Sequence, residues 1–242
     1  MNTWTDKIDH TTRFHNCPAK EYIHDSQYAF ITDSGIRSSV MMVTGPNVKR
    51  HVLSGLPLLP KNGRILIVEL DGIVYAGINS ALYFLRDHHK FSEKRVVVVN
   101  ANVSSYTDYT KTGYPYRIED IDLCKTFGSI KGLIYYRLFT QANDCQPIHK
   151  NKKKCMAITS STRTYTKLNS LKDLNEVLSI IGAEININAT MSSVQRVQKG
   201  VKKYDVQFKT KGRLDKIELH TYREDPENDG GTPMFTVIFS YI

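Results

Sequence analysis

Cysteine is scarce in this chain, and no stretch is apolar enough to cross a membrane. Its 242 residues include four cysteines, none of which forms a C-x-x-C pair: Cys17, Cys124, Cys145 and Cys155. Four scattered cysteines cannot build a disulfide scaffold for a chain of this size, so we expect free thiols in a reducing compartment. No window approaches 18 consecutive apolar residues, and the first residues have no apolar run of the signal-peptide kind. We therefore expect no membrane partner.

The short motifs that accompany catalysis are also missing. The sequence has no G-x-x-x-x-G-K-[ST] phosphate loop, no G-x-G-x-x-G dinucleotide fingerprint and no G-x-S-x-G nucleophile elbow. Cys145, His149 and Cys155 supply three donors at an unfamiliar spacing, and His88-His89 lacks an H-E-x-x-H partner. These absences predict a protein that is not an enzyme, with no catalytic residues, no metal site and no required cofactor.

One enzymatic alternative stays open. Metal-free cleavage of a phosphodiester needs only a His, a cation and a phenol near one another. His24, Tyr165 and Lys167 are candidates for such a nuclease, although no spacing connects them. The acidic residues of segment 119–122 could do acid and base work, but a solvated face is the ordinary explanation for them.

The excess of basic residues has two explanations. The 33 Lys and Arg against 24 Asp and Glu give a net charge of +9 and a pI near 9.3. This charge favours a basic nucleic-acid- or nucleotide-binding protein, with the cluster 149–154 and the alternating segment 201–209 as candidate surfaces. The other explanation is a charge that changes with pH, because ionising 14 Tyr and 4 Cys would bring the net charge to about −9.

Residues 62–90 are predicted to form the centre of the fold. Asn62-Gly63 and Asp71-Gly72 tolerate positive φ, and the residues between them are β-branched or large, which is typical of a buried hairpin. The second strand of this hairpin, 73–76, would lead into a helix near 79–90 with Asn79 as its N-cap.

Strands outnumber helices in the rest of the chain. We expect a helix near 170–181, capped by Ser170 and ended by Gly182. Residues 1–25 would form a protruding N-terminal helix or arm, with any helix there ending at Pro18, and residues 26–242 a single domain. Strands are expected at 36–43, 96–99, 132–140, 203–209, 214–222 and 234–242, the last three as a meander. The predicted fold class is α+β and mainly β, an antiparallel β-sandwich with a few flanking helices.

The loop 100–116 carries four tyrosines: Tyr106, Tyr109, Tyr114 and Tyr116. Tyr buries a large area at low entropy cost and keeps a hydrogen-bonding tip, so this concentration favours an interface, with a solvent-facing loop as the alternative. We expect these four residues to make assembly contacts that alkali disrupts, since phenolates repel one another.

Three segments carry a resemblance to a known family. They are Asn62-Gly63 before RILIVEL, Tyr75-Ala-Gly77-Ile78-Asn79 before ALYFLRDHH, and Val98-Val99-Asn100 before the loop to Pro115. In this arrangement the chain resembles the polyhedrins of cypoviruses, which form the crystalline matrix that occludes virus particles. The resemblance covers residues 26–116.

The resemblance implies a structural, self-assembling matrix protein. Its copies would form trimers packed into a lattice around virus particles, in occlusion bodies in the cytoplasm of the host cell. Bound nucleotides between molecules are implied, with no residues named for them, and the lattice would dissolve at alkaline pH. The tyrosines of the 100–116 loop would supply the alkali-sensitive contacts.

Overall fold

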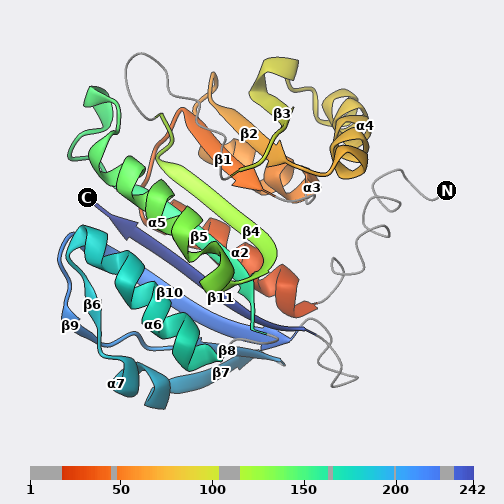
Figure 1. Cartoon of the computed structure of the whole chain (residues 1–242). Coiled ribbons are helices and arrows are strands. Elements are labelled where there is room, and N and C mark those ends of the chain that lie inside the picture. Colours follow the sequence, from red (N-terminus) through yellow and green to blue (C-terminus); the bar gives the residue numbers. More distant parts are fainter. Residues whose placement is uncertain (1–17, 45–47, 104–114, 163–165, 199, 224–231) are drawn as a thin grey trace.

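Nine strands form one mixed sheet at the centre of the molecule (Figure 1). The computed structural model describes residues 18–44, 48–103, 115–162, 166–198, 200–223 and 232–242. The strand order is β3-β2-β1-β4-β5-β11-β10-β8-β7, and a second small sheet pairs β6 with β9. The strands are β1 Val40–Thr44, β2 Arg64–Glu69, β3 Val96–Asn100, β4 Ile118–Thr126, β5 Lys154–Ser161, β6 Glu184–Ile185, β7 Val194–Gln198, β8 Val201–Tyr204, β9 Phe208–Thr210, β10 Leu214–Arg223 and β11 Pro233–Tyr241.

Helices connect most of these strands. Five of the described helices are π or 3-10 turns, and three of these five continue other helices: η1 His51–Gly55 and η2 Leu56–Leu58 continue α3, and η5 Ser179–Ile181 continues α6. None of the described helices combines the length and the hydrophobicity that a membrane crossing needs. The remaining helices are α2 Pro18–Asp33, α3 Val48–Arg50, α4 Gly72–His89, η3 Glu93–Arg95, α5 Phe127–Asn143, η4 Pro147–His149, α6 Lys167–Leu178 and α7 Ile187–Ser192.

The five strands β3, β2, β1, β4 and β5 run parallel. Met41 of β1 is in register with Ile65 of β2 on one side and with Ile118 of β4 on the other. Parallel neighbours need long crossovers, and α4 and α5 supply them between β2 and β3 and between β4 and β5. The predicted antiparallel β-sandwich is therefore wrong, because half of this sheet is parallel and helices, not a second sheet, cover it.

The other half of the sheet is antiparallel. β11 pairs with β5, β10 with β11, β8 with β10, and β7 with β8. The three strands predicted as a meander near the carboxyl terminus lie side by side as β8, β10 and β11, so their pairing is confirmed, although the first of them divides into β8 and β9.

Two layers of helices sandwich the sheet (Figure 1). One apolar cluster joins α2, the α3 turn and α4 to alternate residues of the parallel strands, such as Met41 and Ile65. The second cluster joins α5 and α6 to the opposite face, with Met42 and Leu66 pointing into it. Adjacent residues of β1 and β2 thus enter different cores, which explains why these strands are apolar on both faces.

The central hairpin predicted at 62–76 is wrong. β2 pairs with β1 and β3, both in parallel, and residues 72–89 form a single helix, α4. Asp71 ends the turn and caps this helix, accepting hydrogen bonds from the amides of Ile73 and Val74 at 2.8 and 3.1 Å. Asn79 lies inside the helix, where its side chain donates to the Tyr75 carbonyl. An Asp-Gly pair is compatible with the start of a helix as well as with a turn. Here the packing of α4 on the sheet favours the helix.

Two further predictions, a strand and a helix cap, are wrong. The strand expected at 132–140 is part of α5, whose buried residues Ile130, Ile134 and Leu138 repeat every four positions. Pro18 is the first residue of α2, a position that needs no amide hydrogen, and the residues before it, where a helix ending at Pro18 is predicted, lie outside the described structure. Thr166 caps α6, and its hydroxyl accepts from the amide of Asn169, whereas the predicted cap lies within the helix.

Candidate active site

The strand order reverses between β1 and β4. From β1 the chain moves outward to β2 and β3, then returns to β4 on the other side of β1. Because these strands are parallel, their carboxyl ends meet at one edge of the sheet, near Thr44, Glu69, Asn100 and Asp122. Ligands of open α/β sheets bind outside this edge at such a switch point.

A buried ion pair lies at the switch point. Lys20, in the first turn of α2, places its Nζ 3.4 Å from Oδ2 of Asp122, and their side chains are 4% and 15% exposed. The Thr44 hydroxyl fixes the backbone of Asp122, donating to its carbonyl at 3.2 Å and accepting from its amide at 2.9 Å. These contacts join α2 to the ends of β1 and β4.

Asp120 lies two residues earlier on the same face of β4. Burial and, to a smaller extent, the charge of Asp122 raise the pKa of its carboxyl to about 7, while the charge of Lys20 opposes both effects. Its Oδ1 is buried and has no hydrogen-bond partner among the described residues. Two carboxyl groups with different environments therefore face α2 near the switch point.

Two neutral histidines complete this group. Burial lowers the pKa of His24 to about 3 and of His51 to about 4, although the charge of Asp122 opposes both shifts. Both ring nitrogens of His24 and both side-chain polar atoms of Gln27 are buried without a hydrogen-bond partner in the described structure. Nδ1 of His51 lies 2.7 Å from the Tyr28 hydroxyl.

We call Lys20, His24, Gln27, His51, Asp120 and Asp122 the α2 polar cluster. Buried polar atoms without partners are rare in folded proteins, and each such atom calls for water or a ligand group. The described residues contain no group of three His, Cys, Asp or Glu side chains that could hold a metal ion. The unpartnered polar atoms of His24, Gln27 and Asp120 are suited to hydrogen bonds with water or with polar organic groups.

The ends of β2 and β3 present a different surface. Glu69 accepts a hydrogen bond from the amide of Asp71 at 2.9 Å, and Asn100 donates to the carbonyls of Glu69 and Leu70, each at 3.0 Å. Leu70 and Ile73 are 64% and 84% exposed, although both are large apolar side chains. The part of the edge formed by β2 and β3 thus combines the fixed Glu69 carboxylate with an exposed apolar surface.

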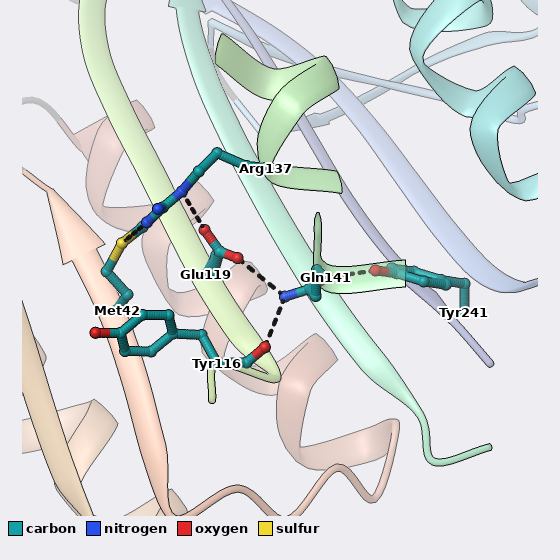
Figure 2. Close-up of polar contacts among 6 residues, drawn as sticks. All are labelled: Met42, Tyr116, Glu119, Arg137, Gln141 and Tyr241. Carbon is teal, nitrogen blue, oxygen red and sulfur yellow. Dashed lines mark hydrogen bonds and ion pairs between the residues drawn. The ribbon is translucent and has the colours of Figure 1, made fainter. Parts of the chain in front are cut away.

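A separate polar network lies on the opposite face of β4, beneath α5 (Figure 2). The Glu119 carboxylate accepts hydrogen bonds from Nε of Arg137 at 2.9 Å and from Nε2 of Gln141 at 3.2 Å. Gln141 in turn accepts from the hydroxyl of Tyr241 at 2.7 Å. The expectation that the acidic residues of 119–122 form a solvated face is wrong, because Glu119 and Asp120 are at most 3% exposed.

The residues predicted for sites are widely separated. Tyr116 is 1% exposed, and its carbonyl accepts from Gln141. His24 belongs to the α2 polar cluster, whereas Lys167 lies on the opposite face of the sheet and contacts Tyr204. The structure therefore does not bring these two nuclease candidates together. Other predictions lie outside the described residues, namely Tyr106, Tyr109, Tyr114, Tyr165 and the arm over 1–17.

Sequence reasoning missed the residues that meet at the switch point. Lys20 and Asp122 are far apart in the sequence, so no local spacing connects them. Segment 118–122 does carry a signal for a ligand-binding edge, because apolar and acidic residues are interspersed there before a segment that leads into a helix. Polar residues that follow a buried strand are typical of the ligand-binding edge of an α/β sheet.

Solved structures of other proteins have a fold similar to that of this chain. No protein-family model matches the chain, and no curated protein is significantly similar to it in sequence. A solved structure from Klebsiella pneumoniae, assigned as an O-methyltransferase, superposes with a TM-score of 0.54 at 11% identity, over 100% of this chain and 91% of that one. The two chains share a Rossmann-like α/β fold. An rRNA methylase from Streptococcus thermophilus is similar at a TM-score of 0.49 and 10% identity, over 90% of this chain and 96% of that one.

This fold overturns the resemblance to polyhedrins. The predictions of a viral matrix protein, of trimers packed in a lattice around virus particles, and of a protein without enzymatic activity or required cofactor are wrong, because the chain has a mixed α/β fold that it shares with a structure assigned as an O-methyltransferase. The alternatives of a nucleic-acid- or nucleotide-binding protein without catalysis and of a metal-free nuclease are not supported either, and the same holds for lattice nucleotides.

Proposed function

We propose that this protein is a methyltransferase that uses S-adenosylmethionine. The observation that carries the proposal is the buried Lys20–Asp122 pair at the switch point of a sheet with this fold. When bound, S-adenosylmethionine supplies an electrophilic methyl group on a sulfonium. The fold supports this cofactor in particular, because its sheet is shared with a protein assigned as an O-methyltransferase.

The residues at the edge fit the cofactor in kind. Glu69 offers a carboxylate for ribose hydroxyls, and the exposed side chains of Leu70 and Ile73 offer apolar contact for a purine. Asp122 offers negative charge toward a sulfonium. One feature departs from dinucleotide-binding sheets, since the sequence after β1 has a single glycine, Gly45, and no G-x-G-x-x-G.

The α2 polar cluster would bind the methyl acceptor and take up the proton that the acceptor releases. Transfer of a methyl group to an O–H or N–H acceptor releases one proton, which a protein group must take. Asp122 is the more exposed carboxylate and would accept a hydrogen bond from the acceptor, while Lys20 holds it in place. Asp120 has a pKa of about 7 and would store the proton behind it.

Calorimetry with S-adenosylmethionine and S-adenosylhomocysteine tests the cofactor without knowledge of the acceptor. We expect both to bind the full chain with dissociation constants in the micromolar range, and Glu69→Ala to weaken them about tenfold through the lost ribose contact. Asp215→Asn is the matched control, because Asp215 pairs with Lys153 at the other edge of the sheet. Absence of binding at millimolar ligand would refute the proposal.

A further inference from the structure

A basic cavity of about 510 Å³ lies between the start of α6 and the ends of β8 and β10. It lies at the same edge of the sheet as the switch point, because the end of β5 is in register with the start of β11, which is in register with the end of β10. None of the described residues that line it is acidic. Four of its lining side chains are basic and exposed: Lys167, Arg196, Lys202 and Arg223.

Two of these cations face each other directly. Arg196 of β7 and Lys202 of β8 are register partners on adjacent strands, so their side chains share one face. Like charges directly opposite one another destabilise a sheet. Neither residue forms an ion pair with any described carboxylate, in contrast to the next residue, Lys203, whose Nζ lies 3.1 Å from Oε1 of Glu218.

Lys167 adds a third cation to the same face. It is the first residue of α6, and its Nζ lies 2.7 Å from the Tyr204 hydroxyl and 5.3 Å from the centre of the Tyr204 ring. These contacts fix the ammonium group beside the strands. The amino end of α6 contributes a positive partial charge at the same place. The cavity is therefore suited to phosphate groups.

The cavity reaches the edge of the sheet next to α2, although its cations Lys167, Arg196 and Lys202 lie on the α6 face, opposite the α2 polar cluster. Tyr222 and Met234 line it, and both also pack against Ala19 and Ile23 of α2, on either side of Lys20 in the sequence. β10 is three strands away from β4 in the sheet, which corresponds to about 14 Å. A chain of a few nucleotides spans that distance.

We propose that this cavity binds the phosphates of a polynucleotide strand and thereby presents one of its nucleotides to the α2 polar cluster for methylation. This inference rests on the proposed methyltransferase function and names its substrate class. Phosphate contacts position a strand without reading its sequence, so the cations determine affinity and register. The residues at the switch point would recognise the group that is methylated.

The test is a charge-reversal pair in the full chain. Fluorescence anisotropy with a labelled single-stranded RNA of 20 nucleotides measures affinity against salt for the wild type and for Arg196→Glu/Lys202→Glu. We expect the double variant to bind about 30-fold more weakly at 0.1 M salt, and the slope of log K against log salt to fall by about 1.4, which is two contacts at about 0.7 each.

The matched control reverses two cations at another cavity. Lys61 and Lys94 line a cavity beside the amino ends of β2 and β3, away from the switch point. Lys61→Glu/Lys94→Glu changes the net charge equally, and we expect less than a threefold loss of affinity. Equal losses in the two double variants, or none in either, would overturn the inference, since binding would then follow net charge alone or not involve the cavity.

Two further measurements separate the inference from the proposed function. The Arg196→Glu/Lys202→Glu variant should bind S-adenosylhomocysteine as the wild type does, so a loss confined to RNA supports the cavity. Wild-type cofactor binding with unchanged RNA binding in the variant refutes the cavity alone. Transfer of tritiated methyl to RNA or to DNA of the same sequence identifies which polynucleotide is the substrate, and transfer to neither refutes the inference.

Discussion

Arg137 Nε lies 2.9 Å from Glu119 Oε2, and the two side chains are 1% and 0% exposed. Gln141 donates to the other oxygen of Glu119, so this buried carboxylate has partners on both sides (Figure 2). We expect Arg137→Met to lower the free energy of unfolding by about 3–5 kcal/mol, because it leaves a charge buried without its counter-ion. Urea denaturation measures the change.

The control is Lys90→Met. Lys90 Nζ also lies 2.9 Å from a carboxylate oxygen, that of Asp87, but both side chains are exposed. Solvent screens this pair, so we expect no measurable loss of stability. Equal effects of the two variants would show that burial does not govern the Arg137 contact.

The pair at the switch point predicts a loss of catalysis. Asp122→Asn keeps the shape of the side chain and removes its charge, so we expect kcat for methyl transfer to polynucleotide to fall about 100-fold or more. Lys20→Met should lower kcat as well, because it releases Asp122 from its position. Cofactor affinity by calorimetry should change less than threefold in Lys20→Met, and a large loss there would assign Lys20 to cofactor binding.

Asp120 predicts a pH-dependent stability. Its pKa is raised from an ordinary value near 3.8 to about 7 in the folded protein, so the folded state binds the proton more tightly than the unfolded state. Asp120 therefore stabilises the fold below pH 4, and that contribution is lost as the pH rises from about 4 to about 7. Replacement by Asn should remove this dependence.

The measurement compares urea denaturation of wild type and Asp120→Asn between pH 5 and pH 8. We expect the variant to gain stability relative to wild type as the pH rises, by an order of a few kcal/mol, since one pKa unit corresponds to about 1.4 kcal/mol. Asp144→Asn, at the exposed end of α5, is the control. A constant difference across this range would contradict the raised pKa.

Position 212 is not expected to tolerate a residue with a side chain. Its φ is +53°, and a Cβ there would collide with the backbone of Ile181 and Gly182. We expect Gly212→Ala to destabilise the protein by about 3 kcal/mol or more, because both the conformation and the contact oppose it. Gly72→Ala is the control: a Cβ at the start of α4 meets nothing within 4 Å, so thermal unfolding should occur at the same or higher temperature.

Part of this fold could be predicted from the sequence. The four-valine strand at 96–99 is confirmed as β3, the strand at 36–43 overlaps β1, and Gly182 ends the α6 segment in the left-handed conformation as predicted. These segments depend on local properties, namely apolar runs and permissive glycine. Local properties also explain the antiparallel pairing of β10 with β11, two neighbouring strands in the sequence.

The parallel half of the sheet could not be predicted in the same way. A buried apolar run indicates a strand but does not specify its partners, so the sequence predicts a hairpin at β2, although both neighbours of β2 are parallel to it. Residues 73–76 are rich in strand-forming types, yet they lie in α4 because the apolar positions Ile78, Ala81, Leu82 and Leu85 pack on the sheet. The α2 polar cluster depends on that topology and was missed with it.

The place of α2 has a consequence for protein synthesis. This helix leaves the ribosome before every strand that the structure describes, yet its residues Ala19 and Ile23 pack against Val201, Tyr222 and Met234, which are translated late. A nascent chain without β10 and β11 lacks the contacts of Ala19 and Ile23 with Tyr222 and Met234, which hold the first turns of α2 on either side of Lys20. The α2 polar cluster therefore forms fully only after β10 and β11 have been synthesised, so a chain truncated before β10 should lack the fixed Lys20–Asp122 pair.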